Sequence, residues 1–184
     1  MKRNRTKNKS LNIRILTLTA LLSSLAIVLS FLEGLLPDLP FVIPGMKLGL
    51  SNIVIMFSLE ILPLPSALII LGFKALFALF TRGAAAGLLS FCGGLLSTLA
   101  MYLLVKSRKP QFGSLGIGIT GAFFHNFGQL VIAYLIVSKG ILPYIPVLCV
   151  FSLLTGALTG LVNSIILPAV SRIPYFEDMW YLQS

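Results

Sequence analysis

Charged side chains are scarce in this sequence. They make up 10% of its 184 residues, whereas a soluble domain carries about 25%. Hydrophobic residues make up 57% of the chain, and the mean hydropathy is +1.00. Because so few charges cannot cover the surface of a soluble protein, we predict an integral membrane protein.

The sequence also lacks the residue patterns on which many enzymes depend. It has no Gly-x4-Gly-Lys-Ser/Thr loop for nucleotide phosphates. Its two aspartates, Asp38 and Asp178, are far apart in the chain and do not form a carboxylate pair for magnesium and a diphosphate. One histidine and the separate Cys92 and Cys149 do not make a zinc site. We therefore predict no catalytic residue, no metal site and no cofactor.

Long apolar runs are what the sequence has in abundance. They do not alternate with a period of two, so they indicate helices rather than a β-barrel. We predict an all-α polytopic membrane protein, a six-transmembrane-helix bundle in one domain over residues 14–168. Residues 1–13 form a basic tail, and residues 169–184 form a short C-terminal tail. The helices are expected at residues 14–36, 47–62, 64–81, 84–105, 115–137 and 142–168.

Basic residues set the expected orientation in the membrane. Six of the 14 lysines and arginines lie within residues 2–14. A basic arm can bind nucleic acid, but directly before an apolar span it is typical of anchoring to the cytoplasmic face of a lipid bilayer. The turn at residues 106–109 and Arg172 fall on the same side as this tail, so we predict that both termini are cytoplasmic.

Residues 37–46 form an unusual connection between the first two spans. Three prolines and a glycine prevent a continuous helix there, yet most of the other side chains are apolar. We predict that this segment packs over the outer side of the bundle as a lid.

Two basic residues of the third span are candidates for substrate binding. Lys74 lies in the apolar interior of the span, where a charged residue usually has a function; alternatively, its long side chain reaches the interface. Arg82 ends the span, where it either binds a ligand or anchors the helix at the interface. Together with Lys47 they predict an electropositive outer cavity that suits an anionic ligand.

Polar residues of other spans are the remaining substrate-binding candidates. His125 and Gln129 project from one helix face, and Asn126 lies about 100° away. With Asn52 and Asn163 they either line the cavity or form hydrogen bonds between helices. Nearby aromatic side chains are expected to stack on an apolar part of the ligand: Phe123, Phe124 and Phe127.

Small residues predict where helices approach one another closely. The pair Ala20 and Ser24 in the first span, and the pair Gly156 and Gly160 in the sixth, have the small-x-x-x-small spacing of helix interfaces.

Two runs of the sequence resemble a known family. Residues 43–53 read Ile-Pro-Gly-Met-Lys-Leu-Gly-Leu-Ser-Asn-Ile, and residues 121–129 read Gly-Ala-Phe-Phe-His-Asn-Phe-Gly-Gln. Through them the chain resembles, over about residues 13–167, the bacterial membrane family labelled Gx transporter or heptaprenyl diphosphate synthase component I. More distantly, it is similar to the substrate-binding S components of energy-coupling factor (ECF) transporters.

The resemblances imply two alternative functions, and a third alternative stays open beside them. As an ECF S component, the chain would bind a small-molecule substrate for uptake across the bacterial cell membrane. Ala20 and Ser24 would then dock on a transmembrane coupling subunit, and separate ATPases would supply the energy. The synthase label implies instead a non-catalytic membrane subunit associated with polyprenyl (heptaprenyl) diphosphate or quinone synthesis. The third alternative is a membrane scaffold of a flavin- or quinone-linked redox complex.

Overall fold

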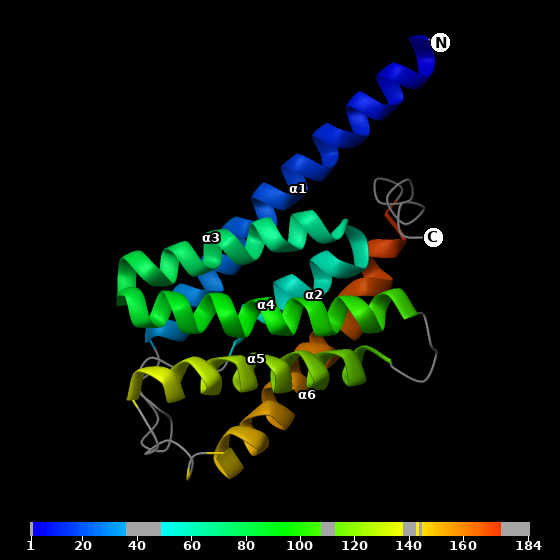
Figure 1. Cartoon of the computed structure of the whole chain (residues 1–184). Helices are drawn as coiled ribbons and strands as arrows, with labels where there is room; N and C mark the ends of the chain where they lie inside the picture. Colours follow the sequence, from blue (N-terminus) through cyan, green and yellow to red (C-terminus); the bar gives the residue numbers. More distant parts are fainter. Residues whose placement is uncertain (1, 36–48, 108–112, 138–142, 144, 174–184) are drawn as a thin grey trace.

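The structure, a computed structural model, describes residues 2–35, 49–107, 113–137, 143 and 145–173, and the backbone alone for residues 2–10 and 137. The described residues form six α-helices and no strand (Figure 1). The predicted lid at residues 37–46 and Lys47 lie outside the described residues. The helices are α1 (Lys2–Leu35), α2 (Asn52–Ile61), α3 (Leu64–Arg82), α4 (Ala84–Ser107), α5 (Ser114–Val137) and α6 (Ile145–Ser171).

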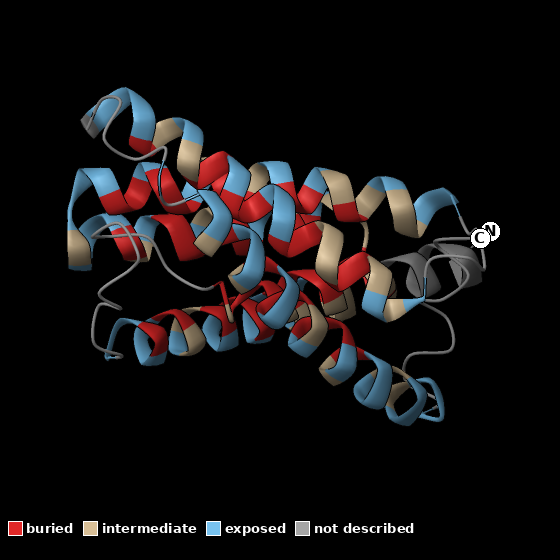
Figure 2. Cartoon of the chain, turned by 90° about the horizontal axis from the view of Figure 1, so that it is seen from below, coloured by how far each residue is buried: buried red, intermediate tan, exposed pale blue. Residues whose placement is uncertain are grey.

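Five of these helices are long and apolar enough to cross a membrane: α1 from Leu11 onward, α3, α4, α5 and α6. Large apolar side chains also cover their outer faces, where Phe80 is 84% exposed and Leu135 is 74% exposed. Buried residues face the centre of the bundle and exposed residues face outward (Figure 2). An apolar outer surface suits lipid, and this arrangement confirms the predicted helical membrane bundle.

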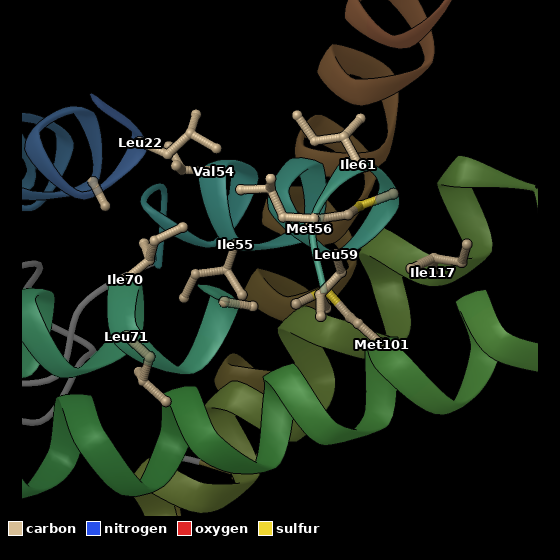
Figure 3. Close-up of a cluster of buried hydrophobic side chains, with 13 residues drawn as sticks. Leu22, Val54, Ile55, Met56, Leu59, Ile61, Ile70, Leu71, Met101 and Ile117 are labelled. Carbon is tan, nitrogen blue, oxygen red and sulfur yellow. The ribbon is translucent and has the colours of Figure 1, made fainter. Parts of the chain in front are cut away.

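α2 is the central helix of the bundle. It packs against all five other helices, and seven of its ten residues are buried. Figure 3 shows its residues Ile55, Met56 and Leu59 among apolar side chains of the neighbouring helices. With ten residues it extends about 15 Å, which is half of the about 30 Å thickness of a bilayer core. The second predicted span is therefore shorter than expected. None of the ten residues of α2 is exposed, so protein encloses this helix.

Tight reversals connect α2, α3 and α4. Pro63 precedes α3 and Pro65 lies in its first turn, where proline is compatible with a helix. Gly83 links α3 to α4 with φ of +92°, a conformation that favours glycine.

Glycines bring α5 close to both of its neighbours. A Cβ atom added to Gly118 would lie 2.4 Å from the carbonyl oxygen of Gly156, and one added to Gly128 would lie 2.8 Å from the Cα of Gly93. Backbones therefore touch at both crossings, as small residues allow. The Gly156 and Gly160 pair forms the predicted close contact, and its partner is α5.

The two ends of the bundle are distinguished by the helix ends that lie there. The start of α1 and the end of α6 lie at the same end, and α1 extends beyond the bundle there (Figure 1). The C-terminal ends of α1, α3 and α5 lie at the opposite end. Most of the candidate site residues come from the half of the bundle near that opposite end.

Candidate functional site

A small polar cavity lies among α1, α3, α4 and α5. Its free volume is about 10 Å³, which is about the space that one water molecule requires. Four of the predicted site residues meet there: Lys74, Arg82, His125 and Gln129. The complete lining is Ser30, Glu33, Lys74, Arg82, Ala86, Ser90, His125 and Gln129.

Lys74 lies inside the bundle and does not extend to the interface. Its side chain is 3% exposed, and Nζ donates a hydrogen bond to Oδ1 of Asn52 at 3.0 Å. Asn52 is the first residue of α2, so this bond joins the central helix to α3. The side chain therefore does not reach the interface, and the ligand-binding role of Lys74 stays a prediction.

His125 and Gln129 form one wall of the cavity. They lie one turn apart on α5, both buried, with 3.0 Å between Nε2 of His125 and Nε2 of Gln129. Oε1 of Gln129 is buried and has no hydrogen-bond partner among the described residues. The wall therefore retains an unused hydrogen-bond acceptor.

Gly49 packs directly against this wall. Its φ is +83°, and an added Cβ atom would lie 2.7 Å from Nδ2 of Asn52 and 3.0 Å from Cδ2 of His125. Both the backbone conformation and the close approach require glycine.

Glu33 is a cavity residue that sequence reasoning did not select. Its side chain is 2% exposed, and its carboxylate accepts hydrogen bonds from the backbone N–H groups of Gly49 and Leu50. These bonds join the end of α1 to the entry of α2, on either side of the predicted lid segment. The available signal was a single acidic residue in an apolar span, the same kind of signal that identified Lys74.

Arg82 lines the cavity and bonds to α1. Its Nη2 donates a hydrogen bond to Oγ of Ser30 at 3.3 Å, while Nε and Nη1 are buried and have no partner among the described residues. Arginine presents these donors in a planar fork that matches a carboxylate or a phosphate. The guanidinium group thus has unused capacity to bind an anion.

Asn126 and Asn163 lie outside the cavity and bond to other helices. Asn126 donates a hydrogen bond to Oγ of Ser152 on α6 at 2.8 Å. Asn163 donates to the carbonyl oxygens of Ile53 on α2 and Thr159 on its own helix, at 3.2 and 3.0 Å. These geometries favour interhelical hydrogen bonding, the alternative that the sequence left open for both asparagines.

Aromatic side chains of α5 also lie away from the cavity. All three are exposed on the outer face of the helix, where Phe123 and Phe127 stack at a centroid distance of 6.5 Å. In this structure they do not line the cavity, contrary to the expectation that they stack on a ligand. The residues concerned are Phe123, Phe124 and Phe127.

Ala20 and Ser24 lie on the exposed side of α1, and Oγ of Ser24 donates a hydrogen bond to the carbonyl oxygen of Ala20 at 3.1 Å. This position leaves both residues accessible from the membrane, so their docking role stays a prediction.

The cavity therefore combines two basic side chains, Lys74 and Arg82, with the carboxylate of Glu33. It is less electropositive than the basic residues alone predict. Among the described residues, no three His, Cys, Asp or Glu side chains gather where they could hold a metal ion.

These features define a helical membrane protein with a charged cavity enclosed among its helices. A family model described as heptaprenyl diphosphate synthase component I matches residues 22–166. Since this range covers most of the chain, the protein belongs to that family. Comparisons with curated proteins and with solved structures give no match. The similarity to ECF S components stays a prediction.

Proposed function

We propose that this protein is a membrane-embedded binding subunit that captures a small anionic metabolite at the polar cavity for uptake. Lys74 and Arg82 bind the negative charge, and His125 and Gln129 orient polar groups of the ligand. The energy comes from separate ATPases, since the sequence contains no phosphate-binding loop.

The observation that carries this proposal is the unused hydrogen-bonding capacity of the cavity. Buried polar groups are normally paired, yet Nε and Nη1 of Arg82, Oε1 of Gln129 and Oγ of Ser90 have no partner among the described residues. These atoms include donors of a cationic side chain. An anion with further polar groups would satisfy both the donors and the acceptors.

A ligand larger than water requires the cavity to expand. Two contacts close it: the hydrogen bond from Arg82 to Ser30, and the bonds from Gly49 and Leu50 to Glu33. The second contact lies where the chain enters and leaves residues 37–46. In the proposal, this segment acts as the lid and faces the outside of the bacterial cell, both termini are cytoplasmic, and Ala20 and Ser24 contact a transmembrane coupling subunit.

Ligand binding to the purified protein tests the proposal. We expect at least one anionic compound among vitamins, flavins, quinone precursors and prenyl diphosphates to raise the unfolding temperature in phosphatidylcholine nanodiscs. A ligand at 100 times its Kd stabilises the folded state by about 2.7 kcal/mol. Lys74→Met and His125→Leu should abolish the shift. Lys106→Met is the matched control, because Lys106 lies near the far end of α4, over the ring of Tyr102. Equal shifts in all variants would show that the cavity is not the binding site.

The family description supports a second candidate function, a non-catalytic membrane subunit of a polyprenyl diphosphate synthase. Co-expression with a soluble prenyl synthase subunit should then raise its turnover. Co-purification with a coupling subunit and two ATPases supports uptake instead. We do not propose the redox scaffold, because no described feature favours it.

A further inference from the structure

Arg82 and Ser30 line both the polar cavity and a second space next to it. This α1–α3 groove is bordered by Ser30, Phe31, Gly34, Leu35, Phe77, Thr81 and Arg82. Its free volume is about 180 Å³, whereas that of the polar cavity is about 10 Å³. The hydrogen bond between Arg82 and Ser30 thus separates a small charged space from a larger one.

The groove is apolar over most of its length and open to the surroundings of the bundle. Phe31 and Leu35 of α1 are 52% and 65% exposed, and Phe77 borders the groove from α3. Since α1 and α3 are both membrane-spanning helices in contact with each other, the groove opens toward the lipid.

We propose that the α1–α3 groove binds the apolar chain of an anionic amphiphile whose head group is bound by Arg82. This inference rests on the proposed function and names the substrate class of the same site. The head group is a phosphate or a carboxylate, which the guanidinium group binds through two parallel hydrogen bonds. The apolar chain lies between α1 and α3, on the side of the site that faces the bilayer.

Charge and space both support this assignment. The buried Nε and Nη1 of Arg82 have no partner among the described residues, and the arginine lines both spaces. The closed polar cavity has too little room for a whole head group, so the anion binds when the Arg82–Ser30 contact opens and the two spaces join. An apolar chain attached to that anion then continues into the groove.

A larger side chain at position 34 can fill the groove without disturbing the helices. An added Cβ atom at Gly34 meets no heavy atom within 4 Å, and the same holds for Gly72 of α3. Gly34 lines the groove, whereas Gly72 does not. Gly34→Leu therefore blocks the groove, and Gly72→Leu is the matched control. Thr81→Phe, at an exposed position of the groove, is the second blocking variant if Gly34→Leu does not fold.

The test measures binding of radiolabelled decyl phosphate to the protein in phosphatidylcholine nanodiscs, with affinity expressed per mole fraction in the membrane. Inorganic phosphate and decanol serve as competitors that carry the head group alone and the chain alone. We expect Gly34→Leu to weaken decyl phosphate binding at least about tenfold, while Gly72→Leu changes it by less than about twofold. Arg82→Gln should weaken it as strongly as the blocking variant, and decanol should not compete.

Three results would overturn the inference. If Gly34→Leu and Thr81→Phe bind decyl phosphate like the wild type, the chain does not occupy the groove. If inorganic phosphate competes as well as unlabelled decyl phosphate, the ligand is a free anion, and the proposed binding function survives without the groove. If neither compound binds and no anionic metabolite stabilises the protein, the proposed function fails as well.

Discussion

The start of α2 and its middle lie in contrasting surroundings. At its start, Asn52 accepts a hydrogen bond from Lys74 beside a cavity with charged walls. One turn later, Ile55 and Met56 are completely buried among the apolar side chains of α1, α3, α4 and α5 (Figure 3). The same short helix therefore joins a region that stabilises the fold to a region with buried polar groups.

Unpaired polar atoms are concentrated in the first of these regions. Of the nine buried side-chain nitrogen and oxygen atoms without a partner among the described residues, five belong to cavity-lining residues. An unpaired buried group costs about 1–3 kcal/mol, so this arrangement lowers stability. The comparison indicates that the apolar region holds the bundle together, while the polar region retains groups for a ligand.

Ile55→Ala should have the largest effect on stability. Ile55 is fully buried in the apolar region, and removing its side chain leaves a cavity that costs about 2–5 kcal/mol. The free energy of unfolding can be measured by titration with SDS in mixed micelles. Ligand affinity of the folded protein should not change. Leu135→Ala, on the lipid-facing surface, is the control and should cost less than about 0.5 kcal/mol. Equal losses at both positions would contradict a special role for the core around α2.

Glu33→Gln should have a smaller effect on stability and a distinct effect on binding. The amide oxygen still accepts hydrogen bonds from Gly49 and Leu50, so we expect a stability change of about 1 kcal/mol. Removing the negative charge beside Lys74 and Arg82 should strengthen anion binding by about threefold or more. Isothermal titration with the ligand identified by thermal stabilisation measures this change. Weaker binding would show instead that Glu33 contacts a cationic part of the ligand.

Asn126→Leu should have the smallest effect of the three. It removes the hydrogen bond to Ser152, and such interhelical bonds in membranes contribute about 0.6 kcal/mol on average. Ligand binding should be unchanged, whereas Gln129→Leu on the cavity-facing side of the same helix should reduce it. The measurement compares ligand-induced thermal shifts of the two variants. Equal reductions would mean that Asn126 belongs to the site after all.

Much of this architecture follows from the sequence through two simple rules. Apolar runs predicted the long helices, and the cost of polar groups in a bilayer identified Lys74, His125 and Gln129 as cavity residues. The same rule did not separate Asn126 from Gln129, because both are polar and lie three residues apart. Which neighbour each side chain faces depends on the packing of α5 between α4 and α6.

Other features depend on tertiary contacts that no local pattern reveals. Glu33 lies near the end of an apolar span, where an acidic residue commonly faces the interface, and its role depends on Gly49, 16 residues later. The central position of α2 was equally hidden, since a mostly apolar helix suits lipid and a protein core alike. Residues 47 and 37–46, which belong to the predicted site and lid, lie outside the described part of the chain.

The short length of α2 has a consequence for how the protein is made. About 20 apolar residues are needed for a helix to enter the bilayer by itself, and α2 has ten. We therefore expect its insertion to depend on α3, to which the turn at Pro63 connects it. Since α2 contacts α4, α5 and α6, we expect it to reach its central place only when these later helices close around it. Chains truncated during synthesis before α4 should thus remain sensitive to proteases at α2, and synthesis through α6 should remove that sensitivity.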